Sequence, residues 1–214
     1  MWGSTSGWPA VLADGPVLLR AYRRSDARAW SEVRIANQTW LAPWESAPPG
    51  PWAEMNSTRA YLYVYRDMKR AARRGDSMPF AVCLREDGRE RLVGHLNLGN
   101  IVRRAFSSAY VGYWVDARVA GRGVIPTALA LAVDHAFGPG GLHRVEVNIR
   151  PENGPSRRVV EKLGFREEAY HRNYLHIDGT WRDHVGYALT TEDVANEGGL
   201  LARWHRQRGI HQSA

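Results

Sequence analysis

The chain has 214 residues, of which 44% are hydrophobic and 24% charged, so it can bury the core of one α/β domain. It contains no run of about eighteen apolar residues, which excludes a membrane-spanning helix, and its N-terminus lacks the basic and apolar regions of a signal peptide. Cys83 is the only cysteine, which excludes a disulfide framework and favours a reducing cytoplasm. The net charge of +7, carried almost entirely by arginine, indicates an anionic partner (phosphate, an acidic peptide or RNA) or simply a soluble surface.

The first half of the chain predicts one strand and two helices. The strand is Pro16–Tyr22. Ser25-Asp26 can cap a first helix that runs to about Asn37. A second helix is expected over Ala53–Arg74, because apolar residues recur along it at helical spacing. Between the two helices, residues 39–52 hold three tryptophans and four prolines, which excludes a regular helix.

The second half predicts further strands and two helices. Val124–Phe137 repeats apolar residues at helical spacing, and Asn153–Leu163 predicts a shorter helix. The strands expected there are Met78–Leu84, Leu92–Leu98, Ala109–Val115, Arg144–Arg150, Tyr170–Ile177 and Thr180–Leu189, the last two flanking a hairpin turn at Asp178-Gly179. This order predicts an α/β (α+β) fold with one mixed, mostly antiparallel sheet and helices on both faces. We expect a flexible segment over residues 1–14, one domain over residues 15–193 and a partly helical tail over residues 194–214.

The loop Arg-Val-Ala-Gly-Arg-Gly joins a predicted strand to the helix that starts at Val124. Backbone N–H groups at a helix N-terminus lack partners and, with the helix dipole, bind anions. Gly121 and Gly123 would let the backbone approach a phosphate, although such a junction is as often only a tight turn. Pro126 has no N–H, so we expect the donors over Val119–Ile125. No Gly-Lys-Ser/Thr follows, which excludes a Walker loop.

A second motif, Asn153-x-x-Ser156 followed by Leu163-Gly164-Phe165, lies about thirty residues further on. Asn and Ser at such positions are, by themselves, ordinary helix caps. Together with Arg118-x-x-Gly121-x-Gly123, however, this motif resembles the GNAT superfamily of acetyl-CoA-dependent N-acetyltransferases, and the similarity covers roughly residues 16–190. Four pieces are similar to the RimJ group of ribosomal-protein alanine N-acetyltransferases: WLAPWE (Trp40–Glu45), YVGYWV (Tyr110–Val115), GRG (Gly121–Gly123) and YLHIDGTWRDHVGYALTTED (Tyr174–Asp193).

The resemblance implies acetyl-CoA as co-substrate and a splayed pair of central strands that receives it. The strand end Val115–Ala117 would pair with the pantetheine arm, and the Asn153 side chain would contact the same arm. The glycine loop would hold the pyrophosphate. The implied cofactor-binding residues are Val115, Ala117, Arg118, Val119, Gly121, Arg122, Gly123, Val124, Ile125 and Asn153.

Two catalytic positions depart from the family pattern. Many members carry a Tyr seven residues after the Asn, where this chain has Val160, and some carry a Glu five residues before it, where this chain has Asn148. Ser156 is then the candidate proton donor to the leaving thiolate, or only a helix cap. Glu146, on the same face of the strand as Asn148, is the candidate base, or only an ion-pair partner of a nearby arginine.

The missing strong base fits an α-amine acceptor better than a lysine. An α-amine has a pKa of about 7.7–8.0 and a lysine one of about 10.4, so neutralising lysine at pH 7 costs roughly 3.5 kcal/mol more. Trp40, Trp44 and Glu45 are expected to shape the acceptor mouth, unless they only pack the Pro-rich loop, and Tyr174 to form the opposite wall. We therefore expect transfer to a protein N-terminus in the cytoplasm, with a ribosomal protein as the substrate that the resemblance implies.

Two alternatives stay open. The same fold can acetylate a lysine or a small-molecule amine, or the chain is a non-catalytic module that binds acyl-CoA or RNA. The departures at positions 148 and 160 motivate the non-catalytic version, and arginine pairs at 23–24, 73–74, 103–104 and 157–158 motivate an RNA contact. The histidines show no spacing typical of metal ligands, and we expect no metal, no DNA and no membrane partner.

Overall fold

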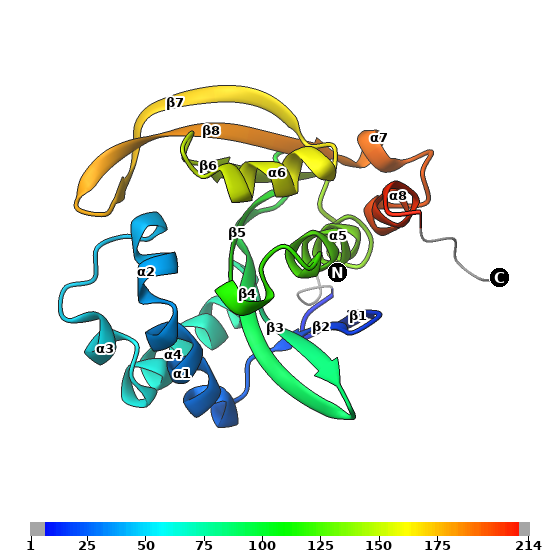
Figure 1. Ribbon diagram of the computed structural model, residues 1–214. Helices are drawn as coiled ribbons and strands as arrows, with labels where there is room; N and C mark the ends of the chain where they lie inside the picture. Colours follow the sequence, from blue (N-terminus) through cyan, green and yellow to red (C-terminus); the bar gives the residue numbers. More distant parts are fainter. Residues whose placement is uncertain (1–6, 210–214) are drawn as a thin grey trace.

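One eight-stranded sheet with the strand order β1-β2-β3-β4-β5-β6-β8-β7 carries the fold (Figure 1). The computed structural model describes residues 7–209. Neighbouring strands run antiparallel except β5 and β6, which are parallel, so the expected mixed, mostly antiparallel sheet is confirmed. The strands are β1 (Val11–Asp14), β2 (Val17–Ala21), β3 (Met78–Glu86), β4 (Arg89–Val102), β5 (Ser108–Val115), β6 (Arg144–Ile149), β7 (Arg166–Ile177) and β8 (Thr180–Thr190).

Helices cover both faces of the sheet, as expected. On one face, α1 and α4 enclose a small core that contains Trp30 and Tyr61. On the other face, α5 lies over the larger core and is buried along nearly its whole length, because α8 packs against its outer side. The helices are α1 (Ala27–Ala36), α2 (Gln38–Leu41), α3 (Trp52–Met55), α4 (Thr58–Arg74), α5 (Val124–Phe137), α6 (Gly154–Lys162), α7 (Thr191–Val194) and α8 (Leu200–Gln207).

Three local predictions were wrong. β1 lies inside the segment expected to be flexible and pairs with β2, while residues 1–6 of that segment lie outside the described range. The helix expected over Ala53–Arg74 is two helices, because Ser57 starts α4 as its N-cap and accepts a hydrogen bond from the Ala60 N–H at 3.2 Å. Asp26 does not cap α1 with its side chain; its carboxylate instead accepts two hydrogen bonds of 2.8 Å from buried Arg20.

The strands β5 and β6 separate toward their carboxyl ends. They pair at three positions only, from Ser108 opposite Arg144 to Tyr110 opposite Glu146. Beyond these pairs, Val111–Val115 has no strand neighbour on the β6 side. Because α5 follows β5 and α6 follows β6, the N-termini of both helices face this opening. The splayed strand pair implied by the resemblance is therefore present.

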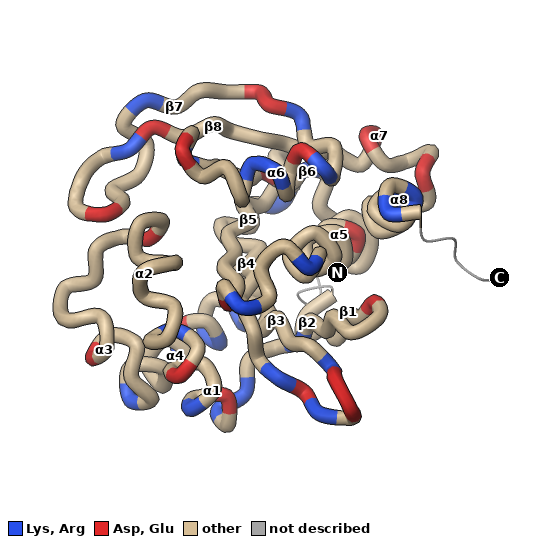
Figure 2. The backbone as a smooth tube through the Cα atoms, viewed as in Figure 1, with Lys and Arg blue, Asp and Glu red and all other residues tan. Residues whose placement is uncertain are grey.

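Basic and acidic residues are interspersed along the chain (Figure 2). Both signs occur on the β3–β4 hairpin and on β7 and β8. Many arginines lie within ion-pair distance of a carboxylate, as Arg144 does with Glu146 and Glu168. The net charge of +7 is thus not gathered on one element, and the RNA contact stays a prediction. Within residues 7–209, no helix is long and apolar enough to cross a membrane.

Candidate active site

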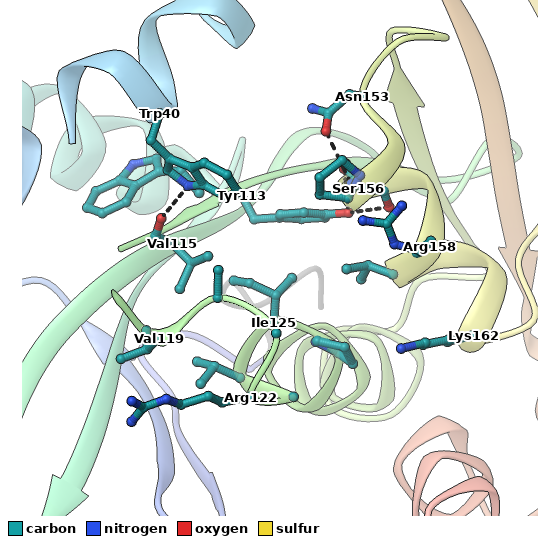
Figure 3. Close-up of a pocket in the computed structure, with 18 of the residues that line it drawn as sticks. Trp40, Tyr113, Val115, Val119, Arg122, Ile125, Asn153, Ser156, Arg158 and Lys162 are labelled. Carbon is teal, nitrogen blue, oxygen red and sulfur yellow. Dashed lines mark hydrogen bonds between the residues drawn. The ribbon is translucent and has the colours of Figure 1, made fainter. Parts of the chain in front are cut away.

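A cavity of about 540 Å³ opens where β5 and β6 separate (Figure 3). It is bounded by the end of β5, the loop before α5, the first turns of α5 and α6, and the segment around α2, with α8 at one side. The cavity brings together most residues that the sequence predicted for binding or catalysis. Those that line it are Trp40, Trp44, Glu45, Val115, Val119, Gly121, Arg122, Gly123, Val124, Ile125, Asn153 and Ser156.

The two glycines of the loop have a conformational reason. Gly121 and Gly123 adopt the left-handed backbone, with φ of +79° and +81°, which other residues rarely adopt. The loop uses three of its own amides, since residues 119, 120 and 122 each donate to a carbonyl three residues earlier. The donors left for an anion are the N–H groups of Gly121, Gly123, Val124 and Ile125, at the N-terminus of α5.

Ala117 and Arg118 do not line the cavity, contrary to the expectation. The Ala117 N–H donates to Asn37 Oδ1 at 2.9 Å. The Arg118 guanidinium donates to both carboxylate oxygens of buried Asp116, at 2.6–3.0 Å. Burial raises the pKa of Asp116, but hydrogen bonds from Arg118 and Asn37 outweigh it, so the pKa lies below its ordinary value. These contacts fix the end of β5. The Arg118 guanidinium therefore binds Asp116 and is not placed to bind a phosphate in the cavity.

Four cationic side chains line the cavity: Arg122, Arg158, Lys162 and Arg208. None of them has an acidic partner among residues 7–209, whereas many other arginines do. Glu45 is the one carboxylate among the described residues that line the cavity, and it is bound to Arg34. The cavity therefore carries uncompensated positive charge, which attracts an anionic ligand.

Ser156 and Tyr113 face the cavity from α6 and β5 (Figure 3). Their hydroxyl oxygens lie 2.8 Å apart, so either hydroxyl can donate to the other. Burial raises the pKa of Tyr113, which keeps its phenol protonated at neutral pH. Asn153 Oδ1 accepts from the Ser156 N–H at 3.2 Å, so the Asn153 oxygen caps α6 and its NH₂ group takes no part in that cap. Sequence reasoning missed Tyr113, whose only signal was its place two residues before Val115 on the same strand face.

Trp40, expected at the acceptor mouth, contacts Val115, expected to bind the cofactor. The Asp116 N–H donates to Val93 on β4, so alternation along the strand turns the backbone groups of Val115 to the open side. There Trp40 Nε1 donates to the Val115 carbonyl oxygen at 3.0 Å (Figure 3). The indole thus occupies the backbone acceptor that the pantetheine arm is expected to use.

The segment of Trp44 and Glu45 is fastened to the β7–β8 hairpin. The Asp178 N–H, at the hairpin turn, donates to the Glu45 carbonyl oxygen at 3.0 Å. Arg150 donates to the backbone of Pro43 at 2.7 Å, and its guanidinium lies 5.2 Å from the Trp44 ring centroid. The two segments that the sequence suggested for the acceptor mouth are therefore in contact through Glu45 and Asp178.

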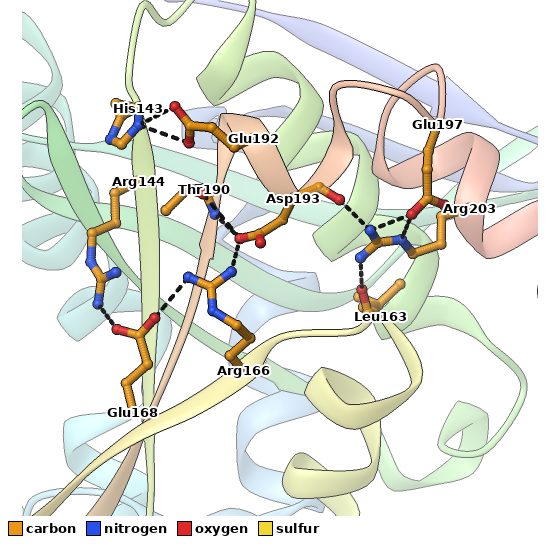
Figure 4. Close-up of polar contacts among 10 residues, drawn as sticks. All are labelled: His143, Arg144, Leu163, Arg166, Glu168, Thr190, Glu192, Asp193, Glu197 and Arg203. Atoms are coloured by element: carbon orange, nitrogen blue, oxygen red, sulfur yellow. Dashed lines mark hydrogen bonds and ion pairs between the residues drawn. The ribbon is translucent and has the colours of Figure 1, made fainter.

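Glu146 lies outside this cavity. It accepts from Arg144 Nε at 2.7 Å, and Arg144 also donates to Glu168 at 2.6 Å. Glu168 and Arg166 continue this chain of ion pairs to Asp193 (Figure 4). The geometry therefore favours the structural alternative for Glu146, an ion-pair partner of a nearby arginine.

Tyr174 also lies outside this cavity, on the face of the sheet away from α5. Asn148 Nδ2 lies 3.4 Å from the Tyr174 hydroxyl, and the Tyr174 ring stacks on His171 with centroids 4.7 Å apart. Asn148 Oδ1 is buried and has no hydrogen-bond partner within residues 7–209. Asn148 stands where some relatives carry the base, but it does not line this cavity.

A second cavity, of about 380 Å³, lies on the α1 and α4 side of the sheet. Trp30, Trp52 and Trp114 surround the Arg34 guanidinium there, whose carbon lies 4.7–5.7 Å from their ring centroids. Glu45 and Trp114 line both cavities, so the two adjoin at the end of β5. The second cavity is mostly apolar and aromatic, and the charge of Arg34 is already paired with Glu45.

Comparison with known proteins identifies the family. Residues 17–166 match the acetyltransferase (GNAT) domain. The chain belongs to this family. The Escherichia coli [ribosomal protein uS5]-alanine N-acetyltransferase is 30% identical over 194 residues, which cover 90% of this chain and 97% of that protein. The structure of Mycobacterium smegmatis RimJ in complex with CoA-disulfide has a TM-score of 0.90 and 37% identity, and the match covers 97% of this chain and 98% of that one.

The residues of the first cavity fit acetyl-CoA, the co-substrate of GNAT enzymes. Free amides at the N-terminus of α5 and four cations without acidic partners meet the charge of its phosphates. The chain is therefore a GNAT N-acetyltransferase that uses acetyl-CoA. Within residues 7–209, no three His, Cys, Asp or Glu side chains gather as metal ligands.

Proposed function

We propose that the enzyme acetylates the N-terminal α-amine of a protein, with a ribosomal protein as acceptor and alanine as its first residue. The observation that carries the proposal is the likeness, over nearly the whole chain, to an enzyme named for a ribosomal-protein alanine. A Vibrio fischeri structure named as a ribosomal-protein-S5-alanine acetyltransferase has the same fold, with a TM-score of 0.77 at 24% identity over 86% of this chain and 98% of that one. A ribosomal acceptor also requires the enzyme to act in the cytoplasm.

The chain's own residues divide the work at the first cavity. When bound, acetyl-CoA supplies an activated acetyl thioester. The free amides before and in the first turn of α5 bind its phosphates, with help from the neighbouring cations. The Tyr113 and Ser156 hydroxyls are hydrogen-bonded at the opening between the strands, and either can donate a proton to the leaving sulfur. If Ser156 donates, Tyr113 can replace the lost proton along the hydrogen bond, so serine need not act alone.

Among the described residues, neither candidate carboxylate base is free, and this favours an α-amine acceptor. Glu45 is bound to Arg34, and Glu146 is bound to Arg144 outside the cavity. An α-amine is partly neutral near pH 7.5, whereas a lysine costs roughly 3.5 kcal/mol more to deprotonate.

The second cavity is the acceptor side in this proposal. It adjoins the first at Glu45 and Trp114, on the face of the sheet opposite α5. Its aromatic walls suit an apolar side chain of the acceptor. Arg34 already lies against the three tryptophan rings, so a second cation would meet like charge there.

The test is acetylation of peptides that differ only at the amine. One peptide carries a free N-terminal Ala, a second a free N-terminal Ser, and a third a blocked N-terminus with an internal Lys. We expect CoA release with the Ala peptide and mass-spectrometric placement of the acetyl group on its α-nitrogen. A folded ribosomal protein with N-terminal Ala tests the macromolecular acceptor.

Two results would overturn the proposal. Acetylation of the blocked Lys peptide alone would make the enzyme a lysine acetyltransferase. Binding of acetyl-CoA by calorimetry with no turnover on any peptide, ribosomal protein or small amine would support the non-catalytic alternative.

A further inference from the structure

The C-terminal helix α8 contributes to the cofactor cavity from outside the family domain. The matched GNAT domain ends at residue 166, whereas α8 spans Leu200–Gln207. Nevertheless, the first cavity is lined by Trp204 of α8 and by Arg208 at the end of that helix. Arg208 directly follows the last helical residue and is exposed to solvent, so a ligand can reach it.

Several contacts hold α8 in a fixed position against α5. Asp134 of α5 accepts from the N–H groups of Leu200 and Leu201 at 2.7 and 3.0 Å, which satisfies the start of α8. Trp204 Nε1 donates to Thr127 Oγ1 at 2.9 Å, in the first turns of α5. The indole is buried, so its place beside the α5 N-terminus is set by packing and by this bond.

Arg203 fastens the same helix to α6 (Figure 4). Its guanidinium donates to the Leu163 carbonyl oxygen at 3.1 Å and to Glu197 at 2.9 Å, and it also contacts the backbone of Asp193. The helix is thus tied to both helices whose N-termini face the opening. These contacts place the last residues of α8 at the edge of the cavity.

Arg208 stands beside the glycine loop. A Cβ atom on Gly123 would lie 3.2 Å from Arg208 Nη1 and 3.6 Å from the Trp204 ring. The Gly123 N–H is one of the four free amides, so the Arg208 guanidinium adjoins the predicted phosphate donors. The guanidinium also lies over the Trp204 ring, 5.3 Å from its centroid, which orients it.

The other arginines of α8 show how unusual Arg208 is. Arg203 and Arg206 both form ion pairs with Glu197. Arg208 has no acidic partner among residues 7–209. A guanidinium without a carboxylate, beside free amides and a helix N-terminus, is suited to a phosphate, which it can bind through two N–H groups.

We propose that α8 is part of the acetyl-CoA site, with Arg208 as a ligand of the CoA phosphates and Trp204 as the residue that positions it. This inference depends on the co-substrate and not on the identity of the acceptor. The structural alternative is that Arg208 only covers Trp204 by stacking. That alternative needs the planar side chain but not a phosphate.

Calorimetric titration of CoA and of 3′-dephospho-CoA into the full chain separates the two roles. Arg208→Gln should weaken CoA binding about tenfold, since a charged hydrogen bond is lost. Arg208→Lys keeps the charge but not the two parallel N–H groups, so it should recover part of the affinity. Arg206→Gln is the matched control on the same helix, because Arg206 pairs with Glu197 and does not line the cavity, and it should bind CoA like the wild type.

The two ligands tell which phosphate Arg208 binds. An equal loss for both assigns the pyrophosphate, and a loss for CoA alone assigns the 3′-phosphate; either supports the proposal. Unchanged binding of both ligands by Arg208→Gln overturns it. So does an equal loss in Arg208→Lys and Arg208→Gln, because stacking and not charge would then be what matters. Acetylation of an unexpected acceptor, or of none, leaves these binding results unaffected.

Discussion

Single residues of the cofactor loop could be predicted from the sequence only where backbone chemistry dictates them. Gly121 and Gly123 follow from the need for a left-handed turn before α5, and both have positive φ. Arg118 looked like a phosphate ligand because of its charge, but it is bound to Asp116. Arg208, ninety residues later, has the free charge that was expected of Arg118. Charge was visible in the sequence, whereas the partner of each charge depends on tertiary contacts.

Gly123→Ala should weaken acetyl-CoA binding more than it lowers stability. The left-handed backbone costs about 1–2 kcal/mol for a residue with a Cβ, and the new methyl group would crowd Arg208. Gly88→Ala is the control, because Gly88 has a similar φ of +71° in the β3–β4 turn with nothing within 4 Å. We expect a similar loss of Tm in both variants and a tenfold or larger rise in the Kd for CoA only in Gly123→Ala. If the two variants have the same Kd for CoA, the loop only reverses the chain and does not bind the phosphates.

Ser156→Ala and Tyr113→Phe should each lower kcat by roughly 10²-fold, the low end of general-acid catalysis, with little change in the KM for acetyl-CoA. The reason is the shared hydrogen bond of 2.8 Å between the two hydroxyls. If they act as one unit, the double variant loses no more than the more impaired single variant. Steady-state kinetics of the three variants measures this; losses that multiply would indicate separate roles.

A helix or strand could be predicted from the sequence when the residues that start and end it lie within it or next to it. The limits of α5 were predicted at Val124 and Phe137 because an apolar repeat is bounded by glycines at both ends. The split between α3 and α4 was missed because the apolar repeat behind the prediction, Tyr61 to Met68, lies wholly within α4 and does not mark where that helix starts. The position of α8 could not be predicted, since its start is satisfied by Asp134, 66 residues earlier in the chain.

Asp134→Ala should loosen α8 and, with it, the cofactor site. Its carboxylate accepts from the first two N–H groups of α8, and loss of such a cap costs about 0.5–2 kcal/mol. We expect a lower Tm and weaker CoA binding together, with Asp134→Asn intermediate because its amide oxygen still accepts. Native-state hydrogen exchange would locate the change in residues 200–207. Normal exchange there would show that α8 is held by its apolar contacts alone.

At the scale of the whole molecule, the fold class was predictable because the order of strands and helices, the hairpin turn and the glycine loop agree with one another. The proposed acceptor side was not, because the second cavity is assembled from α1, α3, α4 and β5, and no short motif encodes its shape. Arg34 illustrates the point. In the sequence it is one arginine among many, yet it is buried among three tryptophans and bound to Glu45.

Stability should fall in two stages as the pH is lowered. Burial, assisted by Arg34, lowers the pKa of His95 to about 4, so the folded state disfavours its protonation and stability declines from about pH 6.5 to 4. Hydrogen bonds from Arg203 and from His143 lower the pKa values of Glu197 and Glu192 to about 2, so their contribution is full above about pH 4.5 and is lost toward pH 2.

Tm values measured from pH 7.5 to 2.5 test this order. His95→Gln should reduce the stage between pH 6.5 and 4, to which His184 also contributes because burial lowers its pKa. Added salt should reduce the lower stage, because Glu192 and Glu197 are exposed to solvent. A Tm that is constant from pH 6.5 to 4 in the wild type would contradict the assignment to His95.

The hydrogen bond from Trp40 to Val115 has a consequence for how the two substrates influence each other. If the pantetheine arm takes the Val115 carbonyl, the indole must leave it, and Trp40 belongs to the segment that also carries Trp44 and Glu45. Each substrate then alters the affinity for the other through one side chain. Thermodynamic linkage requires that factor to be the same in both directions, so the acceptor must change the affinity for acetyl-CoA by as much as acetyl-CoA changes that for the acceptor.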